Sequence, residues 1–200
     1  MARKPVAEIP TESILAVYAD STPAQRAAGV AWYAEANRVA RTLSERYGVT
    51  VEQAAGVIAA VSPLNSWGAN VNLATRIIAA GGMLNGYLGV GLRKANAILM
   101  GLDPVDVLRS QKVAAFYQGI ISNGQTDAVC VDRHSYSVAV GERTVNVPSI
   151  TPARYVALQS AYVRAAATVP GVSPAELQAI TWLAWRARYW AEGAFDPKGE

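Results

Sequence analysis

The 200-residue sequence has very little cysteine and histidine, with a single residue of each, Cys130 and His134. One cysteine excludes an intrachain disulfide, and it also excludes an iron–sulfur cluster held by four cysteines. A zinc site of the usual cysteine and histidine type needs more ligands than these two residues supply. The sequence therefore predicts no metal and no cofactor, and His134 is interpreted as a polar residue in the first turn of a helix.

Long apolar runs and dense charge are missing too. Every apolar run is interrupted by glycine, proline or charge, whereas a membrane span needs about 20 apolar residues in a row. Arg3 and Lys4 are not followed by the apolar core of a signal peptide, so we expect a cytoplasmic protein without a membrane partner. The net charge of +3 permits a nucleic-acid partner but does not require one.

The sequence has many helix-start signals, including capping boxes at Thr50–Gln53 and Ser173–Glu176. Apolar spacing predicts an all-α fold of about eight to ten helices, in one domain over residues 1–200 with a loose tail at 1–10. Residues 86–91 are expected to be a connection, and 129–131 and 143–147 are extended but too short for a sheet. The predicted helices cover 11–19, 23–47, 51–61, 67–80, 92–100, 104–108, 110–121, 133–140, 152–168 and 174–190.

One stretch, residues 128–141, contains the principal candidate site residue, Asp132. The apolar run Val129–Val131 leads into Asp132 where a helical pattern begins, and Gly141 ends that helix. An N-cap carboxylate accepts a backbone N–H from two or three residues further on, and the helix dipole favours its ionised form. Two interpretations stay open: an ordinary N-cap, or a fixed anion with a chemical role.

Two other segments hold candidate residues. Lys112 lies in the first turn of a predicted helix, where the dipole disfavours a cation; it is either a solvated lysine or one that binds phosphate or forms a Schiff base. Residues 62–67 form a link broken by Pro63, which places Asn65 and Trp67 either at a pocket mouth, where an aromatic ring stacks on a base, or in a packed turn.

The order of these segments resembles the helix-hairpin-helix DNA glycosylases of the endonuclease III type, over about residues 55–188. Val131-Asp132-Arg133-His134 resembles the family's Val-Asp-Thr-His segment, and residues 59–75 resemble its Leu-Ser-Ala-Gln motif and following helix. Residues 91–98 and 179–186 are similar to two later helices of that family. The resemblance implies a two-lobed helical fold close to small phage-encoded relatives, without the iron–sulfur cluster and located in the host cytoplasm.

The resemblance also implies roles for individual residues. Asp132 matches the essential aspartate, which stabilises an oxocarbenium ion or activates the nucleophile, and Lys112 matches the Schiff-base lysine. Leu64 and Asn65 fall where the family probes the duplex, and the target base would be flipped into a pocket between the lobes. The other residues expected to contact DNA or substrate are Ser62, Trp67, Arg109, Gln111, Arg133 and His134.

The hairpin is where the sequence departs from the family. Residues 108–112 read Leu-Arg-Ser-Gln-Lys, without the Gly-hydrophobic-Gly turn whose N–H groups bind a phosphate, and the similar Gly89-Val90-Gly91 lies one segment too early. Three hypotheses follow. The protein is an N-glycosylase acting on duplex or single-stranded DNA, with optional lyase activity; a non-catalytic DNA- or protein-binding module on the same scaffold; or a phage enzyme of DNA base hypermodification.

Overall fold

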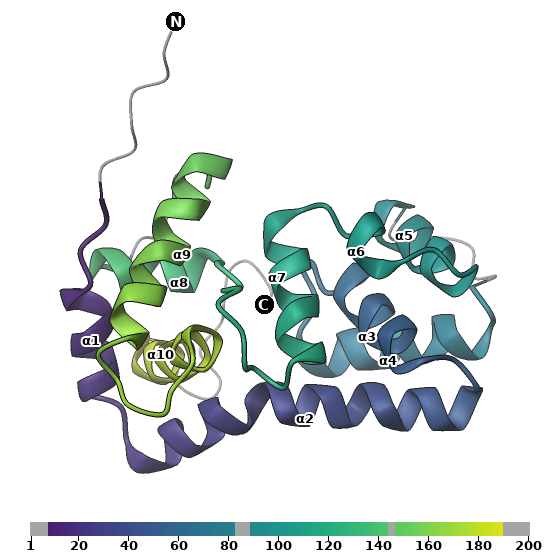
Figure 1. Ribbon diagram of the computed structural model, residues 1–200, viewed down its shortest axis with the longest axis horizontal. Helices are drawn as coiled ribbons and strands as arrows, with labels where there is room; N and C mark the ends of the chain where they lie inside the picture. The colour runs from purple at the N-terminus through teal and green to yellow at the C-terminus, as the bar shows by residue number, and fades with distance from the viewer. Residues whose placement is uncertain (1–7, 83–88, 144–146, 190–200) are drawn as a thin grey trace, which may run out of the picture. The chain divides into compact units, whose positions relative to one another are not determined.

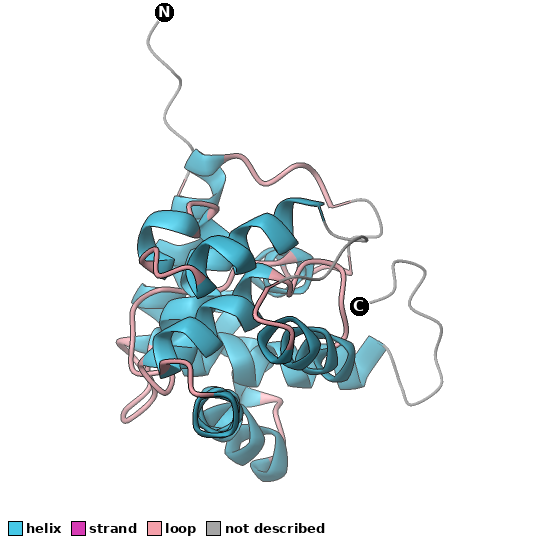
Figure 2. Cartoon of the chain, turned by 90° about the vertical axis from the view of Figure 1, so that its right-hand side faces the viewer, coloured by secondary structure: helices cyan, strands magenta, loops and turns pink. Residues whose placement is uncertain are grey.

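The computed structural model describes residues 8–82, 89–143 and 147–189, and all regular secondary structure in these segments is helical (Figures 1 and 2). This confirms the predicted all-α class. No helix among the described residues combines the length and the apolar character needed to cross a membrane. The helices of these segments are α1 (Glu12–Ala19), α2 (Pro23–Tyr47), α3 (Val51–Ala60), α4 (Trp67–Ala79), α5 (Gly89–Leu99), α6 (Pro104–Val107), α7 (Gln111–Ile121), α8 (Arg133–Val140), α9 (Pro152–Ala166) and α10 (Pro174–Tyr189).

Local capping sets most helix starts, as predicted. In the box that opens α3, Thr50 Oγ1 accepts from the Gln53 N–H at 3.1 Å, while Gln53 Oε1 accepts from the Thr50 N–H at 2.9 Å. The predicted box that opens α10 has the same pair of bonds. A third box, formed by Thr22 and Gln25 at the start of α2, was not predicted.

Most predicted helix bounds agree with the structure to within two residues, and the start of α5 differs most. α5 begins at Gly89 rather than at Leu92, so Gly89-Val90-Gly91 is the first turn of a helix and not part of a connection. Other expectations fall on residues outside the described segments, namely the connection at 86–88, the extended residues 144–146 and Trp190 at the end of the last predicted helix.

The chain divides into two compact units, and each is described by itself. The first unit comprises residues 1–32 and 124–194, and the second unit comprises residues 33–123 and 195–200. The division falls inside α2, between Trp32 and Tyr33.

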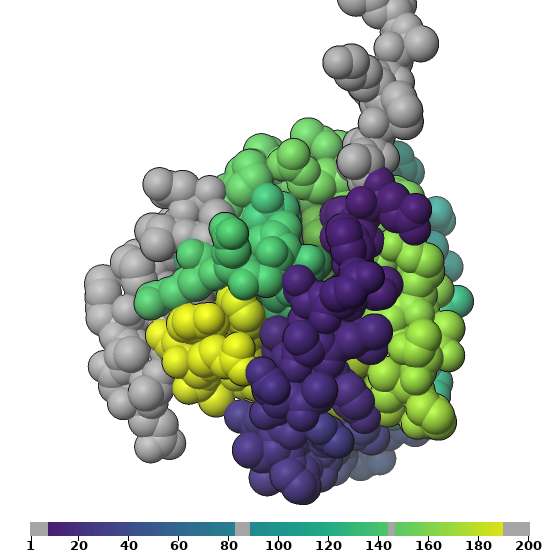
Figure 3. Space-filling view, turned by 90° about the vertical axis from the view of Figure 1, so that its left-hand side faces the viewer, coloured from purple at the N-terminus to yellow at the C-terminus, as the bar shows by residue number. Residues whose placement is uncertain are grey.

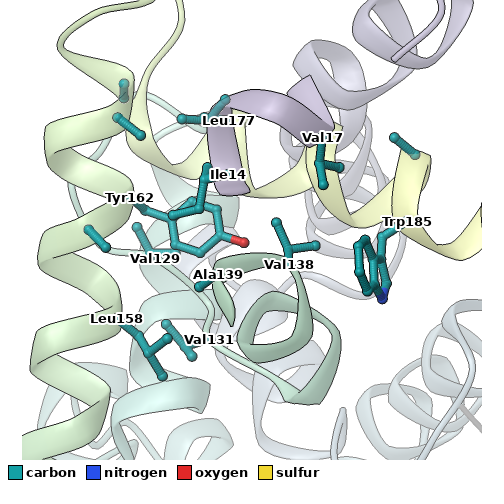
Figure 4. Packing of buried hydrophobic residues seen from close by; sticks show 14 of the residues in the cluster. Ile14, Val17, Val129, Val131, Val138, Ala139, Leu158, Tyr162, Leu177 and Trp185 are labelled. Atoms are coloured by element: carbon teal, nitrogen blue, oxygen red, sulfur yellow. The ribbon is translucent and has the colours of Figure 1, made fainter. Parts of the chain in front are cut away.

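The first unit is built around α10, which contacts α1, α8 and α9. Residues 175–181 of α10 are buried without interruption, so the helix has hardly any solvent-facing side over two turns. Figure 3 shows the purple residues of α1 lying beside the yellow residues of α10. Figure 4 shows the apolar side chains that meet in this core, among them Ile14, Val17, Val129, Val131, Val138, Leu158, Tyr162, Leu177 and Trp185.

The second unit is built in the same way around α3, which contacts α4, α5, α6 and α7. Residues 54–61 are all buried, as expected from a segment that is apolar nearly all round. α2 is joined to α7 by a buried hydrogen bond from Asn37 Nδ2 to the Ile120 carbonyl oxygen, 2.9 Å long.

Two glycines inside helices allow neighbouring helices to approach closely. A Cβ added at Gly29 of α2 would lie 2.6 Å from Ile180 Cα and 2.7 Å from Ile180 N, which are backbone atoms of α10. A Cβ at Gly119 of α7 would lie 2.3 Å from the ring of Tyr33. A side chain at Gly29 therefore forces α2 and α10 apart, and a side chain at Gly119 forces the ring of Tyr33 to move.

Gly29→Ala is expected to destabilise the protein, although glycine to alanine in an open helix stabilises it by up to about 1 kcal/mol. The methyl group would collide with backbone that has no rotamer to change, and overpacking of this kind costs about 1–3 kcal/mol. Urea denaturation measures the change. The matched control is Gly68→Ala in α4, where nothing lies within 4 Å of the added Cβ. An equal gain in free energy of unfolding in both variants would contradict the close approach of Gly29 to Ile180.

Candidate functional site

The Asp132 carboxylate of the first unit accepts hydrogen bonds at both of its oxygens. Oδ1 accepts from the Ser135 N–H at 2.8 Å and from the Ser135 hydroxyl at 2.9 Å, so Asp132 is the predicted N-cap of α8. Oδ2 accepts from the indole Nε1–H of Trp182, 2.9 Å away and 50 residues later on α10. The cap is therefore clamped between two helices, which an ordinary N-cap does not require.

The donors around Asp132 favour a carboxylate over the amide of asparagine. Asparagine caps a helix as well as aspartate does, but its amide has one acceptor and one donating NH₂ group. In either orientation that NH₂ would face a donor, either at Ser135 or at Trp182. An ionised carboxylate accepts at both oxygens. This position therefore distinguishes aspartate from asparagine, whereas an exposed N-cap accepts either residue.

Two buried tyrosines hold the chain on either side of Asp132. The Tyr155 hydroxyl donates to the Val129 carbonyl at 2.6 Å and accepts from the Val131 N–H at 3.2 Å, which fixes the extended residues before the cap. The Tyr162 hydroxyl donates to the Ser135 carbonyl at 3.3 Å. Burial raises the pKa of both phenols, so both hydroxyls keep the proton that they donate.

The two residues after Asp132 differ in exposure. His134 is only 1% exposed, and its ring meets the ring of Trp182 edge to face with centroids 6.0 Å apart. This placement fits its interpretation as a packed polar residue better than its expected role at a DNA surface. Arg133 is half-buried in the first turn of α8.

In the second unit, the predicted link between α3 and α4 presents one apolar side chain to solvent. Leu64 is 76% exposed and has φ +66°, a left-handed conformation that is rare for a residue with a branched side chain. Its neighbours fold back on α3: the Ser62 hydroxyl donates to the Ala59 carbonyl at 3.0 Å, and Asn65 Nδ2 donates to the Val61 carbonyl at 2.8 Å. Asn65 therefore shapes the loop, while Leu64 projects from it.

The other predicted site residues of the second unit lie at helix starts. Trp67 is the first residue of α4 and is half-buried. Gln111 and Lys112 are the first two residues of α7, with Gln111 exposed and Lys112 half-buried. Exposed Arg109 donates from Nε to the Asp106 carbonyl at 2.9 Å. Lys112 and Asp132 belong to different units, so their cooperation stays a prediction.

The partners of Asp132 were not predicted. The sequence places Trp182 in a core helix, and nothing in it distinguishes Ser135 from the other residues of α8. No sequence signal links residues 132 and 182, because the contact depends on how α8 packs on α10. Among the described residues, no group of three or more His, Cys, Asp or Glu side chains is placed to hold a metal ion.

Comparison with known proteins adds a family. A family model with the description "Family of unknown function (DUF7178)" matches residues 3–189. The chain belongs to this family. No curated protein and no solved structure matches the chain. The family description names no activity, so the function has to be argued from the geometry around Asp132.

Asp132→Asn is expected to leave the protein folded but to lower its free energy of unfolding by about 1–3 kcal/mol, because a buried donor then faces a donor. Trp182→Phe removes the N–H that would oppose the asparagine amide. The double variant should therefore lose less free energy of unfolding than the sum of the losses in the two single variants. Urea denaturation of the four proteins measures this coupling.

The control for this cycle is Asp103→Asn at the N-cap of α6. Asp103 caps α6 with a single hydrogen bond, in which Oδ1 accepts from the Val105 N–H at 2.8 Å. Asparagine can replace aspartate in such a cap at little cost in stability. Strict additivity at residues 132 and 182 would show that the indole is not a donor to the carboxylate.

Proposed function

We propose that the protein is a DNA-base-acting enzyme, an N-glycosylase that acts on a base flipped out of the helix. The observation that carries the proposal is the clamped carboxylate of Asp132, held by donors on two helices in a setting that rejects asparagine. A plain N-cap needs one oxygen and no second helix. The proposal also draws on the resemblance of residues 55–188 to helix-hairpin-helix glycosylases.

Cleavage of an N-glycosidic bond is promoted by a fixed anion of this kind. As the bond between the sugar C1′ and the base nitrogen breaks, its electron pair leaves with the base and positive charge builds on the sugar ring. A carboxylate already held in place stabilises this charge without reorganising at the moment of reaction. Water then bonds to C1′ and loses a proton, and the departing base nitrogen gains one.

The second unit supplies a side chain suited to opening a base stack. Apolar wedges inserted between base steps are a known means of unstacking DNA, and leucine is among the residues used. Leu64 is exposed and held in a costly left-handed conformation. Strain of this kind persists when the surroundings impose it, and it occurs preferentially at functional sites. We therefore assign Leu64 to the contact with the base stack.

The first test is base release by the wild type and by Asp132→Asn from oligonucleotides that carry a panel of modified bases. We expect Asp132→Asn to lower the rate of release by at least about a hundredfold, because the charge that stabilises the transition state is gone. Asp103→Asn, which changes an N-cap aspartate elsewhere, should keep the wild-type rate.

Two outcomes would count against this role. Unchanged release by Asp132→Asn would remove Asp132 from the chemistry. If no base is released while DNA binding weakens steeply with salt, the protein is a binding module, because phosphate contacts lose affinity linearly in log–log form with rising salt.

The second test asks whether Lys112 forms a covalent intermediate. If its amine displaces the base at C1′, the base leaves with the electron pair of the glycosidic bond. The C1′–O4′ bond then breaks, O4′ takes a proton, and the resulting Schiff base between Lys112 and C1′ is reduced by borohydride to a stable amine. We expect a trapped protein–DNA adduct with the wild type and with Lys94→Gln, a control lysine on α5, but not with Lys112→Gln. Base loss without an adduct in the wild type would make the enzyme monofunctional.

A further inference from the structure

α10 brings three residues to the Asp132 cluster from one stripe. Gln178, Trp182 and Arg186 are four residues apart, so they lie one above another on the same face of the helix. Trp182 binds the carboxylate directly. Each of the two flanking residues contacts a residue that bonds to Asp132, Gln178 through Ser135 and Arg186 through Trp182.

Gln178 acts on the Ser135 side. Its Nε2 donates to Ser135 Oγ at 3.1 Å, and both side chains are buried, with Gln178 5% and Ser135 0% exposed. Because the amide occupies a lone pair of the hydroxyl, the Ser135 proton must point to an acceptor elsewhere. The Asp132 oxygen at 2.9 Å is closer than the Cys130 carbonyl at 3.4 Å. Hydrogen bonds in such a chain polarise and strengthen one another.

Arg186 acts on the Trp182 side. Its guanidinium carbon lies 4.6 Å from the centroid of the Trp182 ring, a cation–π arrangement. A cation over the ring draws electron density from the indole and makes Nε1–H a stronger donor. The bond that benefits is the 2.9 Å bond to Asp132 Oδ2.

We propose that Gln178 and Arg186 are positioning residues, which fix the orientation of the Asp132 carboxylate through Ser135 and Trp182. The kinetic part of this proposal rests on the proposed glycosylase function, whereas its structural part does not. Gln178 thus acts on Oδ1 through Ser135, and Arg186 acts on Oδ2 through Trp182. The Asp132 carboxylate cannot rotate without breaking one of these hydrogen bonds.

The structural part is tested by NMR on the ¹⁵N-labelled full chain. The indole Nε1–H resonance of Trp182 is assigned by its loss in Trp182→Phe. We expect Arg186→Met, which keeps an apolar stem over the ring but removes the charge, to move this resonance upfield, and Arg186→Lys to leave it near the wild-type position. Gln178→Met should shift the amide resonance of Ser135.

Arg188→Met is the matched control, since Arg188 lies on the same helix but pairs with Asp20 at 2.8 Å, away from the stripe. It should leave both resonances in place. If Arg186→Met and Gln178→Met also leave them in place, the stripe only packs and the proposal is overturned.

Kinetics then tests the functional part on any base that the wild type releases. Misplacing a catalytic group slows chemistry more than binding, so we expect Arg186→Met and Gln178→Met to lower kcat on the order of tenfold or more with KM unchanged. Arg186→Lys should retain most of the rate. Wild-type rates in both methionine variants would overturn the role in catalysis. If the wild type releases no base, the proposed function fails, while the NMR result still decides the positioning.

Discussion

The first unit depends on the need to satisfy polar side chains along a helix that is buried on nearly every side. α10 carries Glu176, Gln178 and Thr181 inside an apolar core, and a buried polar group without a hydrogen bond costs several kcal/mol. Glu176 accepts from Gln125 at 2.7 Å and from the Ser173 N–H at 2.8 Å. Thr181 donates to the carbonyls of Leu177 and Gln178 in its own helix, whereas Gln125 and Ser135, the partners of Glu176 and Gln178, come from segments packed beside α10. These two buried residues therefore also determine what can pack there.

The Asp132 cluster follows from this requirement. Gln178 finds its partner in Ser135, which in turn donates to Asp132, and the next turn of α10 supplies the indole donor of Trp182. The carboxylate is therefore held by the same helix that organises the core. Stability and the proposed chemistry are coupled here, because a change in how α10 packs also moves the donors.

The second unit uses its central helix differently. The buried part of α3 consists of alanine, glycine, valine and isoleucine, so it needs no polar partners beyond its own backbone bonds. Unusual features occur instead where α3 ends, at the loop with Leu64 in a left-handed conformation. The Asn65 amide, which donates to the Val61 carbonyl, holds this loop against the helix end and so maintains the exposed leucine. A rigid apolar helix thus supports a strained loop.

The sequence by itself determined the features that depend on residues three or four apart. It predicted the all-α class, most helix bounds, the boxes at Thr50 and Ser173, and Asp132 as an N-cap, because capping joins groups within one turn. Tertiary structure alone decided that Trp182 meets Asp132 and that Gly29 meets Ile180. Helical periodicity tells which face of a helix is apolar, but it does not tell which helix covers that face. Contacts 50 or more residues apart are set by packing in three dimensions, and so the partners that distinguish Asp132 from an ordinary cap were beyond the reach of the sequence.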